Sequence, residues 1–87
     1  NLKENVSVSL CGVITGIQRI QTKTGSPMLF VKLEDLSDNI EILVFSETLS
    51  KYASLWEEHR AVLVSGKISK RNGDTKLICQ KIQTIEL

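Results

Sequence analysis

Hydrophobic and polar residues alternate over most of the chain, a pattern typical of half-buried β-strands. The clearest case runs from Pro27 to Glu34, where every second residue belongs to a wholly apolar stripe of Leu29, Val31 and Leu33. This stripe is predicted to face the core, because successive side chains of a strand point to opposite sides. The other stripe is therefore predicted to face outward, and it consists of Met28, Phe30, Lys32 and Glu34.

A neighbouring strand is predicted over 39–45 and forms a hairpin with the first one. The segment between them, Asp35 to Asp38, has the composition of a turn. A hairpin loop of this length fixes the register, and the predicted core pairs are Leu33–Ile40, Val31–Ile42 and Leu29–Val44. Both apolar stripes then share one face, and the outer face carries the pairs Lys32–Glu41, Phe30–Leu43 and Met28–Phe45.

Further strands are predicted on either side of this hairpin. The long segment 6–21 contains Gly12 and Gly16, and glycine inside a strand is typical of a bulge or sharp bend that lets one strand serve two sides of a barrel. Residues 22–26 form the turn after it. Towards the C-terminus, Asn72-Gly73 is a strong hairpin signal between predicted strands at 61–71 and 75–85.

Only the segment 46–56 has a helical period, and Ser46 is its predicted N-cap. Its predicted apolar face is Leu49, Tyr52, Ala53 and Trp56. Three strands, a helix and two strands in this order predict a mainly β fold, the five-stranded Greek-key OB-fold barrel, with the short helix closing one end. An SH3-like barrel is the alternative, but it lacks a helix of this length at this place.

The length of 87 residues indicates a single domain, 1–87, and the start at Asn1 leads us to expect a piece excised from a longer chain. The net charge of +1 excludes a polycation, so binding to nucleic acid would require a local basic patch. The chain has no apolar run long enough to cross a membrane and no signal-peptide pattern. We expect Cys11 and Cys79 to be buried free thiols of a cytoplasmic protein, with a disulfide as the alternative.

The sequence contains no catalytic constellation, so no catalytic residue, metal site or cofactor is predicted. His59 is the single histidine and lies among charged residues, which favours a solvated loop position. Four carboxylates cluster around the 35–38 turn without the spacing of a calcium loop, so turn-forming and solubilising roles are favoured. These carboxylates are Glu34, Asp35, Asp38 and Glu41. No phosphate-binding glycine motif is present.

The predicted binding surface is the outer face of the hairpin with the two basic loops 23–26 and 70–74, because this part of an OB barrel binds nucleic acid. An exposed aromatic ring stacks a base and cations follow the phosphates of a single strand. The candidate residues are Lys23, Met28, Phe30, Lys32, Leu43, Lys70, Arg71 and Lys76. With one stacking ring and few cations, binding to single-stranded DNA is expected to be weak and largely non-specific.

Three points stay open on the residues alone. Phe45 either joins the outer face or packs under the following helix. Arg19 either joins the phosphate contacts or is a plain surface residue. The same outer face also suits a protein-interaction or structural module.

Three segments in this order and spacing carry a family resemblance: TKTGSPMLFVKLED, IEILVFSE and VLVSGKISKRNGD. Together they resemble the OB-fold domain of bacterial DNA polymerase III alpha subunits, over about residues 6–85. The resemblance implies an OB domain of the anticodon type that contacts single-stranded template DNA. It also implies a parent chain that is a replicative polymerase, with other domains or subunits as partners and the catalytic carboxylates elsewhere.

The chain also resembles the anticodon-binding domains of class II aspartyl-, asparaginyl- and lysyl-tRNA synthetases, which have an aromatic residue at the position of Phe30. Those domains commonly read Arg-Asp where this chain has Glu34-Asp35, and two of the types place a base-reading Gln at the position of Glu41. A carboxylate there reads uracil poorly and repels phosphate, which favours the polymerase type. It also predicts a face without base specificity, with Glu41 partly neutralising Lys32.

Overall fold

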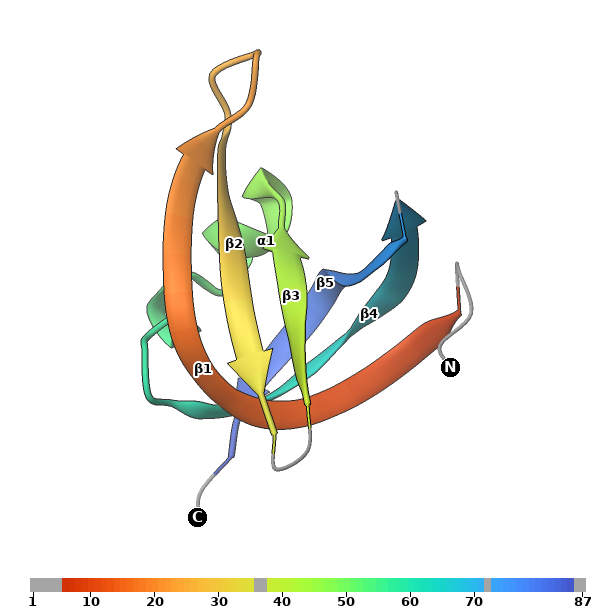
Figure 1. Ribbon diagram of the computed structural model, residues 1–87. Helices are drawn as coiled ribbons and strands as arrows, with labels where there is room; N and C mark the ends of the chain where they lie inside the picture. The colour runs from red at the N-terminus through yellow and green to blue at the C-terminus, as the bar shows by residue number, and fades with distance from the viewer. Residues whose placement is uncertain (1–5, 36–37, 72, 86–87) are drawn as a thin grey trace.

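Five strands close into one barrel in the order β1-β2-β3-β5-β4 in this computed structural model (Figure 1). The structure describes residues 6–35, 38–71 and 73–85, without the side chain of Arg71. The strands are β1 (Ser7–Gln21), β2 (Pro27–Glu34), β3 (Asn39–Val44), β4 (Ala61–Arg71) and β5 (Asp74–Thr84). This is the predicted Greek-key barrel, with each predicted strand in place to within about one residue.

Strand β1 serves two sides of the barrel, as its glycines predicted. Its first half, Ser7–Val13, pairs with β4, and its second half, Val13–Gln21, pairs with β2. The pairing with β2 shifts register between Ile14 and Gly16, and such a bulge bends and twists a strand. Figure 1 shows the resulting curvature, with β1 sweeping along the base of the barrel and then rising beside β2.

The predicted hairpin register of β2 and β3 is confirmed over all three core pairs. The 35–38 turn holds it, since the Asp35 amide donates to the Asp38 carbonyl (3.0 Å) and the Asp38 amide donates to Asp35 Oδ1 (2.8 Å). On its other edge β3 pairs in parallel with β5, with Glu41 opposite Lys76 and Leu43 opposite Ile78. This parallel pairing joins segments that are far apart in the sequence.

The barrel interior is filled by apolar side chains from all five strands and from the segment between β3 and β4. The two predicted core stripes of the hairpin are there, apart from Ile40, which is half-buried and packs against the cluster. The fully buried residues include Ile14, Val31, Ile42, Val44, Val62, Val64, Ile68 and Leu77.

The predicted helix lies between β3 and β4 but is shorter and divided. It consists of α1 (Ser46–Lys51) and a 3₁₀ turn, η1 (Ala53–Leu55). The backbone leaves the helical region at Tyr52 (φ −124°), so Leu49 and Trp56 enter the core from two separate turns. Ser46 is not the N-cap: it is the first helical residue and Phe45 precedes it in an extended conformation. Ala53 is exposed rather than part of an apolar face.

Within the described ranges, no helix has the length and apolarity to cross a membrane.

Both cysteines are free thiols, as expected, but only Cys79 is buried. The expectation for Cys11 was wrong because Cys11 lies opposite Leu63, while its neighbours Leu10 and Gly12 lie opposite the buried Val64 and Val62. Cys11 therefore points outward. Cys79 Sγ donates to the Lys81 carbonyl (3.4 Å).

We expect alkylation to separate the two thiols. Burial raises the pKa of the Cys79 thiol from 9.0 to about 12, and the thiolate is the reactive form. At pH 8 iodoacetamide should modify Cys11 alone, and mass spectrometry of the intact protein should show a second adduct only in denaturant. Two native-state adducts at similar rates would contradict this assignment.

Because unfolded Cys79 loses its proton above about pH 9 and folded Cys79 keeps it, the free energy of unfolding should fall as pH rises from 9 towards 12.

Candidate nucleic-acid interface

Cross-strand pairing brings the candidate residues of β2, β3 and β5 onto one outer surface. Residues that lie opposite each other in adjacent strands point to the same side of a sheet. One row across the strands is Gln18, Phe30, Leu43 and Ile78, and the next is Gly16, Lys32, Glu41 and Lys76. We call these two rows the outer face.

Phe30 is the aromatic residue at the centre of this face. Its side chain is half-buried, and Lys76 Nζ lies 5.9 Å from the centroid of its ring. Leu43 and Ile78, next to it in the same row, are also half-buried. The ring therefore has apolar support on one side and a cation near its face, a contact typical of cation–π pairs.

Lys76 makes the ion pair that the sequence assigned to Lys32. Lys76 Nζ lies 2.6 Å from Glu41 Oε1, and both side chains are partly exposed. Lys32 is opposite Glu41 in the hairpin, as predicted, but it is exposed and forms no ion pair among the described residues. The sequence could not place Lys76 beside Glu41, because that contact depends on the parallel pairing of β3 with β5.

A groove of about 350 Å³ lies beside the ring of Phe30. Ligand pockets typically have volumes of ~300–1,000 Å³, so this groove is at the small end of that range. Its polar lining comes from Gln18, Lys32, Asn39 and Glu41, and Phe30 forms an apolar wall.

The β1–β2 turn holds Lys23 beyond the end of this sheet. The Thr22 amide donates to the Ser26 carbonyl and the Gly25 amide to the Thr22 carbonyl, each at 2.9 Å. Gly25 has φ +86°, which glycine adopts without the penalty of a side chain. These bonds order the turn, and the exposed Lys23 projects from it. Figure 1 shows the turn extending past the strands.

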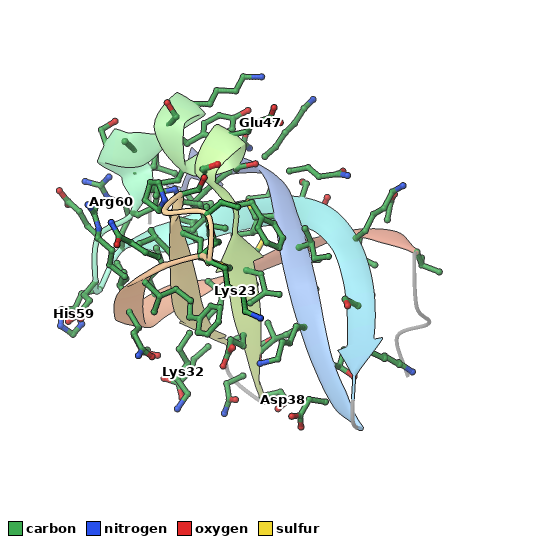
Figure 2. All side chains as sticks on the ribbon, turned by 90° about the horizontal axis from the view of Figure 1, so that it is seen from above. Lys23, Lys32, Asp38, Glu47, His59 and Arg60 are labelled. Carbon is green, nitrogen blue, oxygen red and sulfur yellow. The ribbon has the colours of Figure 1, made fainter. Side chains whose placement is uncertain are left out.

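The β4–β5 hairpin supplies the second basic loop. Lys70 is exposed, although it falls in the same alternation as the buried Ile68. The side chain of Arg71 and the whole of Asn72 lie outside the described residues. Figure 2 shows the β4–β5 hairpin ending on the same side of the barrel as Lys32 and Asp38, with Glu47 of α1 on the opposite side.

Met28 does not belong to the accessible surface, contrary to the sequence prediction. Its exposed fraction is 7% although it lies on the outer stripe and outside the core cluster. Alternation gives the direction of a side chain but not what covers it. Met28 sits at the end of β2, opposite Ile20 of β1, in a strand that also contacts α1.

The structure places the two residues that the sequence left open. Phe45 is 44% exposed, so it does not pack under the helix. Arg19 is exposed but lies opposite the buried Leu29, so it falls in the core-side alternation of β1 and not on the outer face.

The register brings to this region two residues, Gln18 and Ile78, that were not predicted from the sequence. Gln18 lies opposite Phe30 in the β1–β2 hairpin, so counting residue pairs back from the 22–26 turn would have identified it. Ile78 and the exposed Lys67 lie opposite each other in β5 and β4. They join the Phe30 row through the non-local pairing of β3 with β5, which leaves no local signal.

Other polar groups lie away from this face. His59 is exposed, as predicted, in a turn with φ +69° that lies at another edge of the barrel (Figure 2). Arg60 pairs with Glu57 at 2.7 Å. Among the described residues, no three His, Cys, Asp or Glu side chains gather closely enough to hold a metal ion.

Comparisons with known proteins agree with this geometry. The family model for the OB-fold nucleic acid binding domain matches residues 8–85. A DNA polymerase III subunit alpha from Saccharopolyspora erythraea is 32% identical over 80 residues, which make up 92% of this chain but 7% of that protein. The chain thus spans less than a tenth of the length of this relative.

Two solved structures show the same fold. A mitochondrial single-stranded DNA binding protein from S. cerevisiae has a TM-score of 0.77 and 13% identity, with 97% of this chain and 98% of that chain covered. An asparaginyl-tRNA synthetase from Pyrococcus horikoshii has a TM-score of 0.73 and 20% identity, with 95% of this chain and 20% of that chain covered.

Proposed function

Because this chain belongs to the family of OB-fold nucleic acid binding domains, we propose that it is a non-catalytic module that binds single-stranded DNA. The observation that carries the proposal is the outer face itself. It combines the half-buried ring of Phe30 with cations from β2, β5 and the β1–β2 turn. Aromatic stacking with a cationic track is how proteins hold single strands without reading a long sequence.

In this proposal Phe30 stacks a base and Leu43 supports the ring from the neighbouring strand. Lys23, Lys32, Lys70, Arg71 and Lys76 contact phosphates. Lys76 can do so at small cost, because partly exposed ion pairs such as Glu41–Lys76 contribute only ~0–1 kcal/mol. Met28 is left out of the proposed contacts, since it is buried.

We further propose that the chain is one domain of a bacterial replicative DNA polymerase that acts in the cytoplasm. The support is the 32% identity to a DNA polymerase III subunit alpha across most of this chain. Polymerase chemistry would then lie in other parts of the parent protein. Its other domains or subunits would be the partners of this module.

An NMR titration of the isotope-labelled chain with an oligo-dT strand tests the binding function. We expect amide shifts on the outer face and in the 23–26 and 70–74 loops. As salt rises the affinity should fall with a log–log slope of roughly −3 to −4, since each phosphate contact contributes about 0.7. Lys32→Gln should reduce this slope by about 0.7, and Lys51→Gln in α1 should leave it unchanged.

The same titration separates DNA binding from the protein-interaction alternative. Contacts of Phe30 and Leu43 with a protein need not weaken with salt, whereas phosphate contacts must. No shifts at low salt with millimolar DNA would overturn the proposal. Shifts confined to the far side of the barrel around α1 would overturn the assignment of the face.

A further inference from the structure

The groove beside Phe30 contains a hydrogen-bond acceptor that a plain stacking site does not need. Glu41 lines it together with Lys32, Gln18, Asn39 and the ring of Phe30. The sequence predicted a face without base specificity, with Glu41 partly neutralising Lys32. In the structure Glu41 pairs through Oε1 with Lys76, its neighbour in β5, and Lys32 forms no ion pair among the described residues.

Donor and acceptor lie side by side in this groove. Lys32 and Glu41 are opposite residues of β2 and β3, and opposite residues of an antiparallel pair have Cβ atoms about 4.5–5.5 Å apart. The bond to Lys76 uses Oε1 of Glu41. Across the strands the order is therefore a cation that donates, a carboxylate that accepts, and a second cation.

The four bases meet this arrangement differently. The Watson–Crick edge of guanine presents an acceptor, O6, followed by two adjacent donors, N1–H and the N2 amino group. Cytosine and adenine each present one amino donor beside an acceptor, and thymine has one N–H between two carbonyl oxygens. Guanine alone can give a carboxylate two parallel hydrogen bonds while its O6 accepts from a cation.

The remaining polar groups of the groove do not discriminate. Gln18 and Asn39 carry amides that both donate and accept, so they adapt to any base. A base that lacks paired donors places carbonyl or ring lone pairs against the Glu41 carboxylate, and such repulsion generates specificity. The choice of base therefore rests on Glu41.

From this geometry we propose that the groove is a nucleotide subsite that prefers guanine, with Glu41 as the residue that selects it. The inference rests on the proposed binding of single-stranded DNA and adds which base the groove prefers. The base stacks on Phe30 and its Watson–Crick edge bonds to Glu41. Lys32, which contacts a phosphate of an oligo-dT strand, approaches O6 when the base is guanine. A good bidentate contact discriminates against the wrong base by ~1–3 kcal/mol, or about 5- to 150-fold.

Fluorescence anisotropy with labelled 11-mers of dT tests this inference. The central nucleotide is dT, dC, dA, dG or deoxyinosine, which lacks the N2 amino group of guanine. We expect the strand with dG to bind at least fivefold more tightly than all-dT, with deoxyinosine between them. Strands with dA or dC should bind with an affinity closer to that of all-dT than to that of the dG strand.

Two isosteric variants test whether Glu41 causes the preference for dG. Glu41→Gln should abolish the preference for dG and leave or raise the affinity for all-dT, because a negative charge near the phosphates is lost. Glu47→Gln removes the same charge from α1, on the opposite side of the barrel (Figure 2), and should keep the preference. Circular dichroism of both variants should match that of the parent chain.

The outcomes distinguish this inference from the function on which it rests. Equal affinity for all five strands would overturn the guanine subsite and leave DNA binding intact. A dG preference that survives Glu41→Gln would overturn the role of Glu41. Absence of binding to every strand at low salt would overturn both the subsite and the proposed function.

Discussion

Replacing Phe30 by Ala is expected to weaken binding of single-stranded DNA by about 5- to 150-fold while the barrel stays folded. The range corresponds to the ~1–3 kcal/mol that one stacked base contributes. Phe30 is the aromatic residue at the centre of the outer face, so the loss should fall mainly on stacking. Titration with oligo-dT at fixed low salt measures the change.

Two controls separate stacking from packing. Phe30→Leu keeps an apolar side chain against Leu43 and Ile78 but has no π-face, so it should restore stability and not affinity. Leu29→Ala changes the preceding residue, which points into the core and is 2% exposed. That variant should lose ~2–4 kcal/mol of unfolding free energy and keep the DNA affinity of its folded fraction. Full affinity in Phe30→Ala would show that the ring does not hold a base.

Gly66→Ala is expected to destabilise the barrel strongly. A Cβ at this position would lie 2.0 Å from the carbonyl oxygen of Ile78 and 3.1 Å from Cα of Cys79. These are backbone atoms of the paired strand at a register shift of β4 and β5, so no side-chain rotation relieves the overlap. Overpacking typically costs ~1–3 kcal/mol and occasionally more, and we expect about 3 kcal/mol here.

Thermal unfolding measures this loss. For a domain of this size ~1 kcal/mol corresponds to ~4–8 °C, so Tm should fall by roughly 12–24 °C. Gly16→Ala is the matched control, because its added Cβ would meet only Lys32 Cβ at 3.8 Å, an ordinary contact. Equal Tm values for the two variants would show that β4 and β5 do not approach each other as described.

Local patterns accounted for the strands and for the β2–β3 register. The reason is that a side-chain period of two and a short turn together leave one register that buries both stripes. The turn glycines and the Asn72-Gly73 signal are local in the same sense, because each depends only on a few neighbouring residues. The same logic failed at Ser46 and Ala53, because the segment between β3 and β4 breaks at Tyr52 to bring Leu49 and Trp56 into the core.

Local patterns likewise predicted some features of the candidate site and not others. The direction of Phe30 and Lys32 followed from alternation. The burial of Met28 did not, because alternation gives the direction of a side chain but not its cover. The partner of Glu41 did not either, since it depends on β5, a strand from a distant part of the chain.

Short-range sterics and burial set the five strands, the bend of β1, the hairpin pairs and the outward direction of Phe30, so these features could be predicted from the sequence. The parallel pairing of β3 with β5, and with it the contact of Lys76 with Glu41 beside the ring, arises only in the folded barrel. Barrel closure creates that contact, and no local pattern encodes which distant strand closes the barrel.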